Sequence, residues 1–82
     1  MSRTLRSPRQ AALIAYIIAQ REKAGLTQTQ VAKRLKRPQS FVARLESGQR
    51  RVDVVELLEL AEIIGFNPRE ALRVVAAARD HR

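Results

Sequence analysis

The sequence predicts an all-α domain made of five short helices. Apolar residues recur at helical spacing through most of the chain, and no stretch shows the alternation expected of a strand. Gly25, Gly48 and Gly65 stand where three of the helical stretches should end. At 82 residues the chain fits one domain, near the lower size limit for an unaided core. We expect residues 1–6 to form a flexible basic arm and residues 7–80 to form the domain.

The first expected helix starts at Ser7-Pro8 and runs to about Ala24. Ser7 suits the capping position and Pro8 the first helical position, where a missing N–H costs nothing. This stretch holds the longest uninterrupted apolar run of the chain, the nine residues from Ala11 to Ala19. Such a run is far shorter than the roughly 20 residues needed to span a bilayer. We therefore expect no membrane span and a helix that packs within the domain.

The next two helices are short and lie within residues 27–48. Thr27 is a good N-cap, and Gln30, three residues later, can complete a capping box. Pro38 suits the first position of the following helix, which we expect over about 38–46. Two amphipathic helices joined by so tight a turn match the helix-turn-helix layout, which lays its second helix in a DNA major groove.

The last two helices also carry start signals. Asp53 can cap the fourth helix, which Gly65 closes, and Asn67 can cap a fifth that opens with Pro68 and runs to about Arg79. On the fourth helix we expect a buried face of Val54, Leu57, Leu58, Ala61 and Ile64. The expected core as a whole consists of Leu13, Ile14, Ile17, Leu26, Val31, Leu35, Val42, Leu45, Leu57, Leu58, Ala61, Ile64 and Leu72.

The net charge of +8 is unevenly distributed along the chain. Residues 33–51 carry seven Lys and Arg residues against one acid, Glu46, whereas residues 53–62 carry four acids and no base. A polyanion would be drawn to the first segment and repelled from the second. Charge and helix-turn-helix pattern are independent signals, and both favour binding of double-stranded DNA by residues 27–51.

Residues 13–66 resemble the phage lambda repressor and Cro family of DNA-binding domains, also called the Xre type. Six positions carry the resemblance: Gln28, Ala32 and Val42 within the helix-turn-helix, and Arg21, Glu46 and Gly48 in the family's frame around it. One position departs from the pattern, because the family favours glycine where this chain has Lys36. A left-handed residue other than glycine costs about 1 kcal/mol, so either Lys36 bears that strain or the turn is altered.

The resemblance also implies site residues. Gln39, Ser40 and Arg44 share one outward face of the third helix, and the family's residues there read bases; Gln pairs well with adenine and Arg with guanine. The family's Gln at the position of Gln28 contacts phosphate, and we expect the same of Arg37, Arg50 and Arg51, which flank the third helix. Arg21 and Glu46 match an Arg–Glu pair that joins the family's first and third helices.

The expected function is therefore that of a sequence-specific transcriptional regulator, more specifically a repressor, that acts in the cytoplasm. The alternative is a protein-interaction module, such as an antitoxin that binds a partner toxin and regulates its own promoter. Enzyme activity is not expected, because the chain has no cysteine, one histidine (His81) near its end, and no glycine-rich phosphate loop. We also expect no metal, no cofactor and no small-molecule substrate.

We expect a homodimer on a pseudo-palindromic operator. The apolar residues of the fifth helix cover a wider arc than a core-facing helix needs. If Leu72 faces the core, Val74, Val75 and Ala78 remain as a candidate dimer surface, and Tyr16 with Ile18 forms a second.

Overall fold

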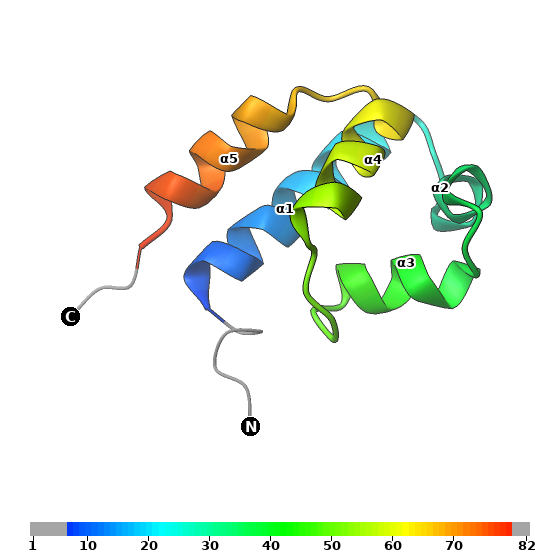
Figure 1. Ribbon diagram of the computed structural model, residues 1–82, viewed down its shortest axis with the longest axis horizontal. Coiled ribbons are helices and arrows are strands. Elements are labelled where there is room, and N and C mark those ends of the chain that lie inside the picture. The colour runs from blue at the N-terminus through cyan, green and yellow to red at the C-terminus, as the bar shows by residue number, and fades with distance from the viewer. Residues whose placement is uncertain (1–6, 80–82) are drawn as a thin grey trace.

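The computed structural model describes residues 7–79, which form a bundle of short helices. In chain order they are α1 (Pro8–Lys23), α2 (Gln28–Leu35), α3 (Gln39–Glu46), α4 (Val54–Ile64) and α5 (Pro68–Ala77) (Figure 1). No strand occurs between residues 7 and 79, so the expected all-α fold of five helices is confirmed. The expected arm over residues 1–6, the last residue of the expected domain (Asp80) and His81 lie outside the described residues.

Four of the five helices begin at capping side chains, as the sequence predicts. Thr27 and Gln30 form a complete capping box, in which the Thr27 hydroxyl accepts from the Gln30 N–H and the Gln30 side chain accepts from the Thr27 N–H. Asp53 and Glu56 form a second box at the start of α4. The sequence predicts Pro38 as the first residue of the next helix, but its backbone is extended, with a ψ of 153°. Pro38 is therefore the N-cap, and α3 begins one residue later, at Gln39.

Lys36 bears the left-handed conformation that the sequence left open. Its φ is 61° and its ψ is 42°. The N–H groups of Lys36 and Arg37 donate back to the carbonyls of Lys33 and Ala32 at 3.1 and 3.0 Å, and thereby close the last turn of α2. Within residues 7–79, Lys36 alone among non-glycine residues has a positive φ. The turn therefore keeps the geometry for which the family favours glycine, at a cost of about 1 kcal/mol.

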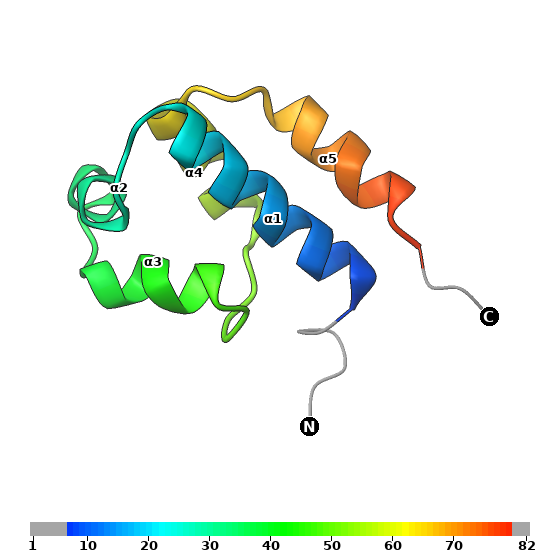
Figure 2. The same ribbon diagram turned by 180° about the vertical axis from the view of Figure 1, so that it is seen from behind.

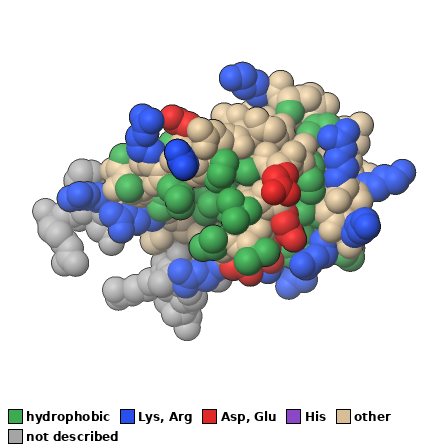
Figure 3. All heavy atoms as spheres, turned by 45° about the horizontal axis from the view of Figure 1, so that its top comes forward, with side chains coloured by type: hydrophobic (Ala, Val, Ile, Leu, Met, Phe, Trp, Pro, Cys, Tyr) green, Lys and Arg blue, Asp and Glu red, His purple; other side chains and the backbone are tan. Residues whose placement is uncertain are grey.

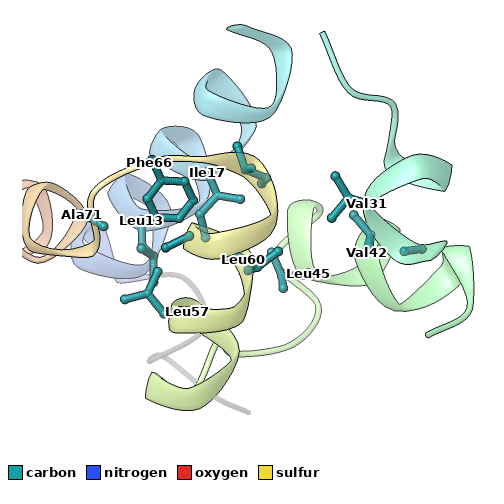
Figure 4. Packing of buried hydrophobic residues seen from close by; sticks show 12 residues of the cluster. Leu13, Ile17, Val31, Val42, Leu45, Leu57, Leu60, Phe66 and Ala71 are labelled. Carbon is teal, nitrogen blue, oxygen red and sulfur yellow. The ribbon is translucent and has the colours of Figure 1, made fainter. Parts of the chain in front are cut away.

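The five helices pack around one apolar core. α5 runs back alongside α1, and α2 and α3 form the opposite end of the molecule (Figures 1 and 2). Figure 4 shows Val31 of α2 and Val42 of α3 projecting into the cluster that Ile17, Leu45 and Leu60 also enter. These five large side chains are almost fully excluded from solvent, so the inner face of α3 is packed firmly against the scaffold.

The core matches the prediction at nine positions and departs from it on α4 and α5. The confirmed buried residues are Leu13, Ile14, Ile17, Val31, Val42, Leu45, Leu57, Ala61 and Ile64, and Leu26 and Leu35 pack against them half-buried. On α4 the expectation for Val54 and Leu58 is wrong, because they are 70% and 46% exposed and Leu60 is buried in their place. Leu60 belongs to the inward-facing stripe that Leu57, Ala61 and Ile64 form at helical spacing, whereas Leu58 lies to one side of that stripe.

On α5 the expected orientation is also wrong. Ala71 is fully buried and Leu72 is 56% exposed. Because Ala71 is small, α5 can approach α1 closely on that side, and Leu72 then points about 100° away around the helix. Val75, one turn after Ala71, packs against the core half-buried. Phe66, just before α5, is buried edge-on against Tyr16 at 5.3 Å between ring centroids.

Candidate nucleic-acid interface

The three candidate base-reading residues lie on the outer side of α3. Gln39, Ser40 and Arg44 are exposed, while Val42 and Leu45 on the same helix are buried. The buried side chains fix the rotation of α3, and so present the other three side chains together to solvent. α3 therefore has the one-sided layout that a groove-reading helix needs.

Arg21 and Glu46 form the expected ion pair between α1 and α3. Arg21 Nε and Nη2 donate to the two carboxylate oxygens of Glu46 at 2.7 and 3.0 Å, and Nη1 donates to the Leu26 carbonyl at 2.8 Å. Only 13% of the Arg21 side chain and 6% of the Glu46 side chain are exposed. The hydrogen bond to Glu46 raises the pKa of Arg21. Loss of one partner from a pair this buried costs about 3–5 kcal/mol, because the other charge stays desolvated.

Gln28 connects this ion pair to the first residue of α3. Its Nε2 donates to Glu46 Oε1 at 2.9 Å, and its Oε1 accepts from Gln39 Nε2 at 2.8 Å. A predicted phosphate-contacting residue and a predicted base-reading residue therefore bond to each other. The contact runs from the buried carboxylate outward to the first residue of α3.

Phe41 lies between two guanidinium groups. The Arg37 guanidinium carbon is 4.6 Å from the ring centroid and that of Arg50 is 4.3 Å from it. At such distances a guanidinium is attracted to the face of the ring by its quadrupole. The half-buried ring thus holds Arg37, which is exposed, beside the start of α3.

Arg50 is engaged within the protein. Its Nη1 and Nη2 donate to the two oxygens of the buried Glu56 carboxylate at 2.9 and 3.0 Å. This hydrogen bonding lowers the pKa of Glu56 and raises that of Arg50. The Arg50 carbonyl accepts from Gln10 Nε2 at 3.4 Å. The expected phosphate contact of Arg50 stays a prediction, while Nη1 and Nη2 of its guanidinium already serve the connection between α3 and α4.

Sequence reasoning did not find three residues of this region: Gln10, Phe41 as a stacking surface, and Glu56. The spacing of Asp53 and Glu56 is that of a capping box and could have indicated Glu56. Nothing in the local sequence indicates that Gln10 reaches a carbonyl 40 positions later.

Basic side chains surround α2 and α3. Lys33, Arg34, Lys36, Arg37, Arg44 and Arg51 are all exposed. Figure 3 shows Lys and Arg side chains gathered at the end of the molecule that α2 and α3 form. The positive potential therefore coincides with the outer face of α3.

A second surface, on α4 and α5, is apolar. Val54, Val55 and Leu58 on α4 and Leu72 on α5 are 46–70% exposed, and we call them the α4–α5 apolar face. Figure 3 looks onto these two helices and shows apolar side chains gathered in the middle, with acidic side chains at one edge. The three residues of α5 that the sequence suggests as a dimer surface are less exposed. Val75 packs against the core, and Val74 and Ala78 are half-buried. The Ala78 carbonyl also accepts a hydrogen bond from Arg9 Nε.

Residues 7–79 contain neither a helix that could span a membrane nor a cluster of metal-ligating side chains. None of the helices described there is both long and apolar enough to cross a bilayer. No group of three or more His, Cys, Asp or Glu side chains in that part of the chain is placed to hold a metal ion.

Comparison with known proteins points to one family. The family model described as a helix-turn-helix domain matches residues 1–75. Among solved structures, an XRE-family like protein from Pseudomonas syringae pv. tomato str. DC3000 is 40% identical, with a TM-score of 0.78, and the match covers 84% of each chain. No curated protein sequence matches this chain significantly.

Proposed function

Because this chain belongs to the Xre-type helix-turn-helix family of DNA-binding regulators, we propose that it is a sequence-specific repressor that binds its operator as a homodimer. The observation that carries the proposal is the anchored outer face of α3. Gln39, Ser40 and Arg44 are exposed there, while the Arg21–Glu46 pair and the buried inner face fix the helix. Repression needs no surface beyond the one that occupies the operator.

In the proposed complex α3 lies in the major groove. Arg44 can donate two hydrogen bonds to guanine O6 and N7, and Gln39 can exchange a pair with adenine N6 and N7. Ser40, one residue after Gln39 on the same exposed side, can donate to or accept from either kind of base edge. The preferred sequence is set by these three side chains together.

Phosphate contacts position the helix in the groove. We assign them to Gln28 at the start of α2, to Arg37 held against Phe41, and to Arg51 after α3. Arg50 contributes charge at this place, but its guanidinium bonds to Glu56. Its main role in the proposal is therefore to fix the connection along which the phosphates would run.

The proposed dimer forms through the α4–α5 apolar face. α4 also carries the exposed acids Glu59 and Glu62, and α5 carries the exposed bases Arg69 and Arg73, of which Arg73 bonds to Glu70 of its own helix at 3.0 Å. A two-fold axis that sets α4 of one copy against α5 of the other would bury Leu58 and Leu72 and bring opposite charges together twice. Each copy would then place one α3 in the groove, with half-sites about 34 Å or 10 base pairs apart.

The same apolar face suits the alternative function, that of an antitoxin or other module with a protein partner. A stoichiometric second protein that copurifies with the native chain, and that Leu72→Asp releases, would favour this alternative over the homodimer.

Selection of bound sequences from random duplex DNA tests the proposed function. We expect a pseudo-palindromic consensus with half-site centres about 10 base pairs apart. Arg44→Ala serves as the matched control, because it removes a side chain from the exposed face and should alter the consensus at one position in each half-site. Recovery of no consensus by the wild type would contradict the proposal.

A further inference from the structure

The carboxylate of Glu46 is the inner end of a chain of hydrogen bonds that reaches the first residue of α3. It accepts from Arg21 Nε at 2.7 Å, from Arg21 Nη2 at 3.0 Å and from Gln28 Nε2 at 2.9 Å. An ionised carboxylate only accepts hydrogen bonds. Gln28 must therefore turn its NH₂ group, and not its carbonyl, toward Glu46.

The orientation of the Gln28 amide sets that of the Gln39 amide. With its NH₂ group turned toward Glu46, Gln28 directs its carbonyl Oε1 toward Gln39 at the start of α3. That oxygen accepts from Gln39 Nε2 at 2.8 Å. The buried, charged end of the chain thus decides which way both amides point, although Gln39 itself is exposed.

The remaining groups of Gln39 are one acceptor, Oε1, and one N–H. In the major groove adenine presents one donor and one acceptor, whereas guanine presents two acceptors. A Gln39 that has already used one N–H can satisfy adenine fully but cannot donate to both acceptors of guanine.

We propose that Glu46, acting through Gln28, sets the amide orientation of Gln39 and thereby makes this protein select adenine against guanine at the base that Gln39 reads. The inference rests on the proposed function, since it needs α3 in the major groove. It makes Glu46 a positioning residue for specificity in addition to its role in the ion pair with Arg21.

The test compares affinities for two duplexes that differ only in adenine or guanine at the position whose preference Gln39→Ala removes. Wild type should prefer adenine by roughly tenfold or more. Glu46→Gln can donate to Gln28, which allows both amides to reverse and gives Gln39 two N–H groups for guanine. We expect it to lose most of the preference for adenine.

Two further variants separate positioning from stability. Arg21→Lys weakens the ion pair but leaves the carboxylate as an acceptor for Gln28, so it should lower the melting temperature and keep the wild-type preference. Gln28→Met leaves the Arg21–Glu46 pair intact and removes the link to Gln39. We expect it to lose the preference with little change in melting temperature, which keeps the test decisive if Glu46→Gln does not fold.

Each result has one reading. If Gln28→Met keeps the full preference for adenine, or if Arg21→Lys loses as much of it as Gln28→Met, the inference is overturned. The inference is also overturned if the wild type selects a sequence but Gln39→Ala alters the preference at no position of it. In that case the proposed function still stands. If wild type selects no sequence at all, the proposed function fails as well.

Discussion

Arg50 and Glu56 form a two-pronged ion pair that joins the end of the helix-turn-helix to the first turn of α4. Both Nη atoms of Arg50 donate to the carboxylate, at 2.9 and 3.0 Å, and the Asp53 N–H donates to it at 3.1 Å. The same guanidinium lies 4.3 Å from the ring centroid of Phe41 on α3. One buried carboxylate therefore supports both the start of α4 and the stacking that flanks α3.

This pair predicts an acid-dependent loss of stability. The hydrogen bonds from Arg50 lower the pKa of Glu56 from its ordinary value of 4.5. A carboxyl whose pKa is lower in the folded state stabilises that state fully above its unfolded value, and the contribution is lost as the pH falls through the folded value. As the pH is lowered below about 4.5, we expect the melting temperature of the wild type to fall, and the melting temperature of Glu56→Gln to fall less steeply. Thermal melts from pH 7 to pH 3 measure both, with Glu59→Gln, exposed on the same helix, as the control. Parallel curves for wild type and Glu56→Gln would contradict the prediction.

DNA binding should depend strongly on salt. Each phosphate contact adds about −0.9 to the slope of log K against log salt concentration, because condensed counterions are released. Several contacts per protomer should therefore give a steep slope, which a titration on one duplex at several salt concentrations measures. Arg51→Ala should reduce the slope by about one unit per protomer. An affinity that barely changes between low and physiological salt would exclude this mode of binding.

Base-reading and phosphate-contacting residues should respond differently to truncation. Arg44→Ala and Gln39→Ala should each cost roughly 1–3 kcal/mol on the preferred site and relax the sequence preference. Arg51→Ala should weaken binding to the preferred and the scrambled duplex alike, since phosphate contacts position the protein without reading sequence. Competition binding on the two duplexes gives the comparison. Equal losses on both for Arg44→Ala would remove Arg44 from the base-reading set.

Lys36→Gly should leave the fold unchanged or stabilise it. Lys36 has a φ of 61°, and glycine relieves the strain of about 1 kcal/mol that this conformation imposes on other residues. The added entropy of the unfolded chain offsets part of the gain. Lys33→Gly is the matched control, because Lys33 is an exposed lysine of the same helix and should lose about 1 kcal/mol there. A clear drop in melting temperature for Lys36→Gly, equal to that of Lys33→Gly, would argue against left-handed strain at the turn.

The α4–α5 apolar face should govern assembly. Sedimentation at micromolar concentration is expected to give a dimer for wild type and a monomer for Leu58→Asp/Leu72→Asp. Both side chains are half-exposed in the single copy, so the fold should survive and a thermal melt can verify it. Ala15→Asp adds a charge to an exposed position on α1, outside α4 and α5, and should leave the dimer intact. A wild type that is monomeric both free and on DNA would refute the dimer, whereas a dimer that survives the double substitution would refute only this surface.

The sequence by itself determined the five helices, the capping side chains of α1, α2, α4 and α5, and the position of the recognition helix to within one residue. The capping boxes at Thr27 and Asp53 bond side chains to backbone a few residues away, so their outcome depends on local sequence. The ion pair of Arg21 and Glu46 was also predictable, but from the family pattern and not from local physics.

Only the tertiary structure decided which flanks of α4 and α5 turn inward and how the side chains around α3 connect. Leu58 and Leu60 are equally apolar by sequence, and Leu72 is more apolar than Ala71, yet Leu60 and Ala71 are the buried ones, because the choice depends on how closely α1 and the other helices can approach. Gln10 reaches Arg50, and Gln28 reaches both Glu46 and Gln39, across segments that are distant along the chain. Such contacts depend on the relative placement of whole helices, which is set by the packing of the entire core and not by the pattern within any one helix.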